Sequence, residues 1–396
     1  MRSVALRVSR PKVPGAYTRI VGSLRQEPSL DGLRAVAVVG VLVYHACAIA
    51  QRGSWFSGGF LGVSLFFVIS GYLMTTLLLA EKADTGTIDA ARFAARRVKR
   101  LQPASLVVVA AAIVLAVPGW TAWSGFHATD ALAAVWGWMN WQVIALGEGQ
   151  VLRGIGPVGP YWSLAVEMQF YVALSLLSLP MRRSAVPRRW LWAFASLSFT
   201  TGAVMQLFVH GNQLQREFST GYRVAELAAG MLLALLLGHR HRSSEHSSST
   251  SLAVLGAAVL LAVVVSFVVA DFDPPWLLSG GFAAYSFLCA ALVHIALRSQ
   301  VWRRLLGHRM LVAVGHLSYS LYLVHWPVAL LVVAHFHHPG VATIVLTLAL
   351  TTVAAVLLHR FVEQPLRRRE ASTRSTLLWG LGASAAVSLM AITLLP

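Results

Sequence analysis

An arginine and a histidine stand eleven residues apart in an otherwise apolar stretch, residues 31–46, which reads DGLRAVAVVGVLVYHA. Eleven residues make almost three helical turns, so Arg34 and His45 share one helix face about 16 Å apart along the axis. Ionisable groups in hydrocarbon are costly, and a pair on one face predicts a polar cavity in which chemistry takes place. The alternative is an arginine that reaches to the membrane surface and an unrelated core histidine.

A second pair of arginines stands in the segment RRVKRLQPA, where a helix is predicted to begin. Arg97 and Arg100 are three residues apart, so on a helix they share a face and can hold one multiply charged anion between them. A phosphate-bearing donor would suit such a site. The alternative is a basic anchor on the inner side of a membrane.

A carboxylate lies in the middle of YWSLAVEMQFY, two turns into a predicted helix. An unpaired buried carboxylate would take up a proton, so we expect Glu167 to have a partner such as Arg34, His45 or Arg223. The contact is either a structural ion pair or part of a catalytic group. Arg223 and Glu226 are also three residues apart, and we expect them to neutralise one another.

Polar side chains recur in LSYSLYLVHWPV. Ser318, Tyr322 and His325 fall on one helical stripe, which either lines a polar cavity or braces a kink before Pro327. Glu363, in the segment FVEQP, is interpreted as the end of a helix at the membrane rim.

The amino-acid composition indicates that these residues lie in a membrane protein. With 57% hydrophobic and 12% charged residues and a mean hydropathy of +0.67, the chain is an all-α polytopic membrane protein. Apolar runs that could cross a bilayer lie near 31–50, 59–80, 101–117, 131–146, 161–180, 190–209, 222–238, 251–270, 279–297, 311–334, 341–361 and 376–394.

The arginines and lysines in the loops decide which run does not cross. If all twelve runs cross, these residues divide 14 inside to 16 outside, whereas without the run 131–146 they divide 27 to 3. Positive charge collects on the cytoplasmic side, so we predict eleven spans, a cytoplasmic N-terminus and an outer C-terminus. The run 131–146 holds Trp136, Trp138 and Trp141 and is predicted to be interfacial or re-entrant.

The same charge distribution explains the net charge of +17. Basic residues at the inner surface set the orientation and attract anionic lipid, so no nucleic-acid partner is needed. We expect a basic tail over 1–28, a membrane domain over 29–365, and a linker with the last span over 366–396. A polar linker is predicted over 239–251, and the oligomeric state stays open. No metal site is expected, because the histidines at 335, 337 and 338 have no cysteine or carboxylate beside them.

Six motifs occur in order over residues 30–365: LDGLRAVAVVGVLVYH, GGFLGVSLFFVISGYLM, RRVKRLQPA, YWSLAVEMQFYVAL, LSYSLYLVHWPV and FVEQP. In this combination the chain resembles the membrane-bound acyltransferase-3 family, which modifies surface polysaccharides and macrolides. The resemblance implies a ten-helix core, here followed by one more span. It also implies transfer of an acyl group, commonly acetyl from coenzyme A, to a hydroxyl of a sugar or natural product in the bacterial cytoplasmic membrane.

The resemblance also implies roles for individual residues. His45 would be the catalytic base, Arg34 its companion in the donor channel, and Arg97 and Arg100 the grip on the coenzyme A phosphates. Glu167 is included among the catalytic candidates. The substrate cavity is expected to be lined by Tyr44, Ser70, Tyr72, Trp162, Ser163, Tyr319, Tyr322 and His325.

Many members of that family carry a soluble transferase domain after an eleventh helix, whereas here residues 376–394 are the last predicted helix. Either a separate partner completes the transfer or the acceptor comes to the membrane site. The simpler expectation is direct transfer to a lipid-linked glycan or to an apolar macrolide. The rival class is a transporter, but inverted halves with helices broken at matching positions are not evident.

Overall fold

The computed structural model describes residues 27–117, 123, 125–147, 156–238, 249–271, 275–336 and 338–396. Most of the predicted basic tail 1–28, most of the polar linker 239–251, and His337 of the three histidines at 335, 337 and 338 lie outside these residues. The described residues confirm the all-α prediction, because long helices joined by short connections account for the fold.

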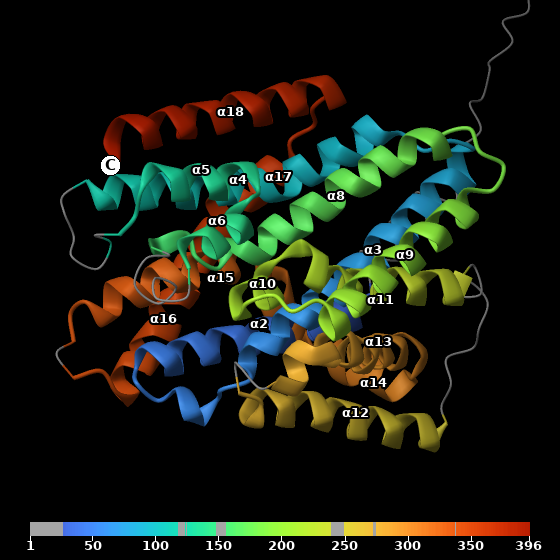
Figure 1. Cartoon of the computed structure of the whole chain (residues 1–396), viewed down its shortest axis with the longest axis horizontal. Helices are drawn as coiled ribbons and strands as arrows, with labels where there is room; N and C mark the ends of the chain where they lie inside the picture. The colour runs from blue at the N-terminus through green and yellow to red at the C-terminus, as the bar shows by residue number, and fades with distance from the viewer. Residues whose placement is uncertain are drawn as a thin grey trace, which may run out of the picture.

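Sixteen α-helices are described, and shorter 3₁₀ or π turns join some of them (Figure 1). The α-helices are α2 Pro28–Ile49, α3 Gly62–Thr85, α4 Ala90–Ala116, α5 Ala128–Trp136, α6 Met139–Leu146, α8 Tyr161–Met181, α9 Pro187–Phe208, α10 Gln213–Phe218, α11 Thr220–Leu237, α12 Thr250–Val269, α13 Phe282–Arg298, α14 Gln300–Leu306, α15 Arg309–Val333, α16 Val341–Leu358, α17 Gln364–Arg368 and α18 Thr373–Leu394.

Eleven helical stretches of the described chain are long and apolar enough to cross a membrane, as predicted. The run 131–146 is not among them. It folds as α5 and α6, of 9 and 8 residues, which are separated at Gly137, where φ is +78°. Eight residues of helix rise only about 12 Å against a hydrocarbon thickness of about 30 Å, so neither helix can span.

Glycines let the helices around α2 approach closely. A Cβ on Gly315 of α15 would lie 2.0 Å from the carbonyl oxygen of Asp31 on α2. A Cβ on Gly230 of α11 would lie 2.0 Å from the carbonyl oxygen of Val68 on α3. Small residues that bring backbones together are the usual way in which membrane helices pack. The helices α2, α3, α11 and α15 therefore form a tight centre, while α12 and α18 lie at opposite edges of the molecule (Figure 1).

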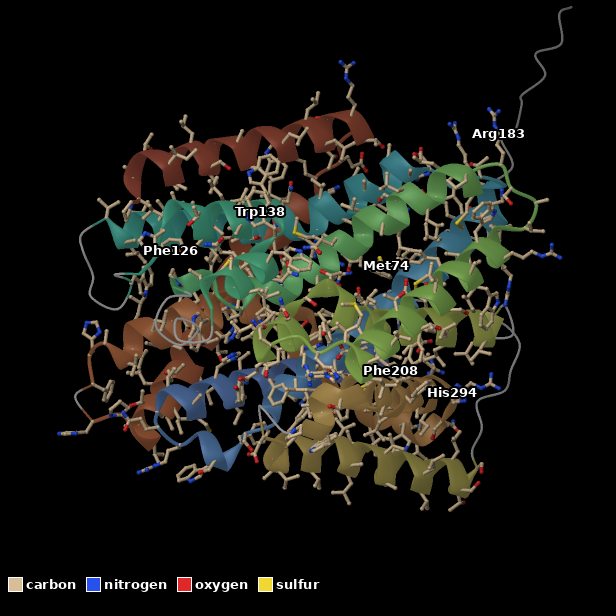
Figure 2. All side chains as sticks on the ribbon, viewed as in Figure 1. Met74, Phe126, Trp138, Arg183, Phe208 and His294 are labelled. Atoms are coloured by element: carbon tan, nitrogen blue, oxygen red, sulfur yellow. The ribbon has the colours of Figure 1, made fainter. Side chains whose placement is uncertain are left out.

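Several basic loops meet at one end of the helices. Lys82 donates a hydrogen bond to the carbonyl oxygen of Arg182, and Arg303 lies 3.2 Å from Glu27. Arg183 lies at this end and Phe126 at the other (Figure 2). We call the end that carries Lys82, Arg182 and Arg303 the basic end.

Candidate active site

Arg34 lies near the basic end of α2 and is held by an ion pair. Its Nη1 donates to Asp31 Oδ1 at 2.6 Å, and His316 Nε2 of α15 lies 3.2 Å from the other oxygen of that carboxylate. The close approach at Gly315 brings His316 to Asp31. Arg34 is therefore a fixed, paired side chain that faces a cavity, and it does not simply extend to the membrane surface.

The basic end opens into a cavity of about 1310 Å³. Arg97 and Arg100 line it from α4, as the spacing predicted, and Arg34 lines it from α2. We call it the basic cavity. Its other charged lining residues are Asp31, Arg96, Lys99, His316, Glu363 and Arg367.

Arg97 lines the basic cavity and has buried guanidinium nitrogens that lack a hydrogen-bond acceptor in the described part of the chain. Its Nε and Nη1 are buried and have no hydrogen-bond partner among the described residues. The guanidinium lies over the rings of Phe93 and Tyr171, at 5.8 and 5.7 Å from their centroids. A buried cation without a hydrogen-bonded anion is costly, so the cavity is suited to an anionic ligand.

A second cavity, of about 710 Å³, continues toward the middle of the bundle, and we call it the inner cavity. Arg34, Arg100, Ser318 and Tyr319 line both cavities, so the two cavities adjoin at these side chains. Of the residues predicted to line a substrate cavity, the inner cavity has Ser70, Ser163, Tyr319 and Tyr322 in its wall, together with Glu167.

The other predicted lining residues lie elsewhere. Tyr72 is 1% exposed and packs in the apolar core, and Trp162 packs against the guanidinium of Arg223, 5.2 Å from its ring centroid. Tyr44 and His325 contact His45 instead. None of these four side chains lines the basic or the inner cavity.

His45 also lies outside both cavities, so neither of them is the predicted cavity that it would share with Arg34. Tyr322 lies between the inner cavity, whose wall it forms in part, and His325. Its hydroxyl donates to the carbonyl oxygen of Pro160 at 2.7 Å and lies 2.6 Å from Ser163 Oγ, while its ring lies 5.3 Å from that of His325.

His45 itself is held by hydrogen bonds at one nitrogen. Nδ1 donates to the carbonyl oxygen of Val41 at 3.1 Å and lies 3.2 Å from Nε2 of His325 on α15. The ring is flanked by Tyr44 and Trp326, with centroids 4.9 and 5.2 Å away. The imidazole is thus fixed in orientation near the end of α2 that lies away from the basic end, and a general base needs such a fixed position.

Glu167 has a partner, but not one of those expected. Ser70 Oγ donates to Oε1 of Glu167 at 2.5 Å, and the Tyr171 hydroxyl donates to the same oxygen. Two hydroxyl donors satisfy the carboxylate, because each can turn its proton toward it. The expectation of Arg34, His45 or Arg223 was wrong. Tyr171 lies one turn further along the same helix and could have been identified from the spacing, whereas Ser70 comes from α3 and could not.

Arg223 is paired within its own helix, as expected. Its Nε donates to Glu226 at 2.6 Å, both side chains are buried, and the guanidinium lies 4.0 Å from the ring centroid of Phe282. The pair joins the packing of α11 and α13, away from the two cavities.

Glu363 does not end a helix, as the sequence had indicated, but lies in the wall of the basic cavity. The helix continues through Val341–Arg368, and a π turn over His359–Glu363 brings the carboxylate inward. It accepts from Ser320 at 2.8 Å and lies 2.9 Å from His359 Nδ1 in the wall of the basic cavity. An acidic residue among rim arginines was the signal that could have identified it.

Comparison with known proteins places the chain in a family. A family model described as an acyltransferase domain matches residues 27–360. The chain belongs to this acyltransferase family. The resemblance inferred from the six motifs is confirmed, and the matched region holds the whole inner cavity and the basic cavity apart from Glu363 and Arg367.

The curated relatives are bacterial members of this acyltransferase family. O-acetyltransferase OatA of Staphylococcus aureus is 32% identical over 355 residues, which cover 88% of this chain and 58% of that protein. A putative O-acetyltransferase of the same species is 31% identical over 358 residues, with 87% and 58% covered. The chain thus spans less than two thirds of the length of these relatives. No solved structure matches it.

Proposed function

We propose that this protein transfers an acetyl group from acetyl-coenzyme A to a hydroxyl of a carbohydrate or of a hydroxyl-bearing natural product. The observation that carries the proposal is that the basic cavity adjoins the inner cavity, with Arg34 and Arg100 in both walls. An elongated donor with a charged head and a neutral arm fits such a path. The names of the relatives, O-acetyltransferases, support the acetyl group.

The donor's charged head would lie in the basic cavity. Phosphate groups would supply the hydrogen-bond acceptors that the buried Nε and Nη1 of Arg97 lack, and Arg100 would add a second cation on the same face of α4. Charge-assisted hydrogen bonds to phosphate are about twice as strong as neutral ones. Arg97 and Arg100 therefore belong to donor binding, and no chemical step needs them.

The neutral arm would extend into the inner cavity toward Ser163 and Tyr322. The thioester would then stand on the near side of the Tyr322 hydroxyl, with His45 on the far side. A change in the position of Tyr322 would bring the two together, because Tyr322 lines the inner cavity and its ring packs against His325 beside His45.

At the far side, His45 would act as the general base. The acceptor oxygen attacks the thioester carbonyl carbon, the proton of the hydroxyl passes to the imidazole, and the carbon–sulfur bond breaks to release coenzyme A, which regains a proton from the imidazole. Such proton transfer contributes about 10²- to 10⁴-fold to a rate. Glu167 lines the donor path and would position Ser70 there.

We place the protein in the bacterial cytoplasmic membrane, with the basic end in the cytoplasm where acyl-coenzyme A is made. The positive-inside rule supports this orientation, since the described basic loops meet at one end. The acceptor would reach His45 from the outer side.

The deciding experiment uses purified protein, acetyl-coenzyme A labelled in the acetyl group, and a panel of acceptors: octyl glucoside, a lipid-linked glycan and a hydroxylated macrolide. Mass spectrometry of the products should show an acetyl ester with one released coenzyme A per ester. If the labelled acetyl group stays on coenzyme A with every acceptor in the panel, the proposal is contradicted. Accumulation of unmodified acceptor inside proteoliposomes would favour the transporter instead.

A further inference from the structure

The contact between His45 and His325 links residues 280 positions apart in the chain. The two rings lie 4.9 Å apart, and Nε2 of His325 faces Nδ1 of His45 at 3.2 Å. His325 is 2% exposed, so it is a buried polar side chain that needs its hydrogen bonds to be satisfied by the protein.

The protonation of His325 follows from its backbone contact. Its Nδ1 lies 2.6 Å from the carbonyl oxygen of Tyr322, and a carbonyl oxygen can only accept a hydrogen bond. Nδ1 of His325 therefore carries the hydrogen. In a neutral imidazole the other nitrogen is then an acceptor, so Nε2 of His325 presents a lone pair to His45.

The tautomer of His45 follows in turn. Its Nδ1 lies between two acceptors, the carbonyl oxygen of Val41 at 3.1 Å and Nε2 of His325 at 3.2 Å. Nδ1 must carry the hydrogen, because a lone pair on Nδ1 would face the lone pairs of both acceptors and repel them. The lone pair of neutral His45 is consequently on Nε2, which has no hydrogen-bond partner among the described residues.

We propose that His325 is a positioning residue that holds His45 in the tautomer whose Nε2 is the base. The assignment rests on the proposed function. When Nε2 takes a proton, the charge spreads to Nδ1–H, and its hydrogen bond to the lone pair of His325 becomes charge-assisted and stronger. His325 thus orients His45 and stabilises its protonated form.

A neutral partner is the appropriate choice at membrane depth. In soluble hydrolases a buried carboxylate orients the catalytic histidine. A carboxylate here would have to be kept charged within the span while His45 is neutral, which is costly in hydrocarbon. A second imidazole accepts the same hydrogen bond without a net charge.

The remaining neighbours of the pair do not replace this contact. Tyr44 and Trp326 meet His45 edge-on, with ring planes 63° and 61° from its own, and Tyr322 packs beside His325. The alternative role for His325 is therefore packing around the helix at Pro327, and the test has to separate packing from positioning.

Three variants separate them: His325→Leu, which fills space without an acceptor; His325→Gln, whose amide oxygen can take the place of Nε2; and His45→Ala. The probes are acetyl-coenzyme A and octyl glucoside, with ester formation and free thiol both measured. His325→Leu should lower kcat by about 10²-fold and leave KM for acetyl-coenzyme A unchanged. His325→Gln should recover most of that loss. His335→Gln, an exposed control just after α15, should behave as wild type.

The double variant His45→Ala/His325→Leu adds a test that a packing role cannot imitate. Residues that act as one unit are not additive, so the double variant should be no slower than His45→Ala alone. Three outcomes would overturn the assignment and leave the proposed function standing. One is a further tenfold loss of rate in the double variant, and another is a His325→Leu enzyme within threefold of the wild-type rate. The third is a folded His325→Gln enzyme that is as slow as His325→Leu. A wild-type protein that releases no coenzyme A would instead remove the proposed function, and the assignment with it.

Discussion

The hydroxyl groups of Tyr322 and Ser163 lie 2.6 Å apart, and Tyr322 also donates to the carbonyl oxygen of Pro160. This contact joins α15 to the start of α8 at the end of the inner cavity. Tyr322 also packs against His325, which contacts His45, so its side chain lies between the inner cavity and that histidine pair. Under the proposed function, Tyr322 would lie between the donor and the base.

The first prediction concerns this position of Tyr322. Tyr322→Phe keeps the ring and removes both hydroxyl contacts, so water should reach the thioester more readily. We expect the ratio of acetyl-coenzyme A hydrolysis to acetyl transfer to rise several-fold, measured as free acetate against ester. Tyr72→Phe is the matched control, because Tyr72 is buried in the apolar core outside both cavities. An equal rise in both variants would point to general loosening of the bundle.

The second prediction concerns His45. His45→Ala should lower acetyl transfer by at least about 10²-fold, because a general base is removed while the helix stays apolar. The measurement is ester formation at matched amounts of inserted protein. His335→Ala serves as the exposed control. A His45→Ala enzyme within tenfold of wild type would exclude His45 as the base.

The third prediction concerns the donor. Arg97→Ala and Arg100→Ala should each weaken coenzyme A binding by about 1–3 kcal/mol, the range for a hydrogen bond to a charged group. Isothermal titration calorimetry measures the change. Arg183→Ala removes an exposed basic residue at the same end and should leave the affinity unaltered (Figure 2). Unchanged affinity in both cavity variants would return the two arginines to the role of topological anchors.

The fourth prediction concerns packing between α3 and α11. Gly230→Ala should destabilise the protein by about 1–3 kcal/mol, because the added Cβ would lie 2.0 Å from the carbonyl oxygen of Val68 and force the helices apart. Thermal unfolding in detergent gives the measurement. Gly382→Ala on α18 is the matched control, since nothing lies within 4 Å of its Cβ position. Equal effects of the two substitutions would contradict the close approach.

The fifth prediction concerns orientation. In a background with Cys47→Ala and Cys289→Ala, Ser184→Cys and Ser372→Cys should be protected from an impermeant thiol reagent in intact cells. Gln213→Cys should react, because one candidate span, α9, lies between Ser184 and Gln213 in the chain. Labelling of Ser184→Cys from outside would place the basic end outside and contradict the assignment of donor entry.

The long apolar helices could be predicted from the sequence because hydropathy and charge are local properties. The eleven spans follow from runs of about 20 apolar residues, and the exclusion of 131–146 follows from the positions of arginines and lysines. Helical spacing likewise placed Arg97 beside Arg100 and paired Arg223 with Glu226, because both pairs lie within one turn.

Contacts between helices were decided only by the tertiary structure. Periodicity put Arg34 and His45 on one face of α2, but in the structure Arg34 lines the two cavities whereas His45 contacts His325 of α15. The contact of Ser70 with Glu167 and the inward turn of Glu363 were likewise not visible in the sequence.

The contact between His45 and His325 depends on how α2 and α15 meet. Gly315 allows the two backbones to approach, and that approach sets the depth at which residues 280 positions apart face one another. One helix has a fixed rise and rotation per residue, so its own faces can be read from its sequence. The register between two helices has no such rule, because it results from the shapes of all the side chains packed between them.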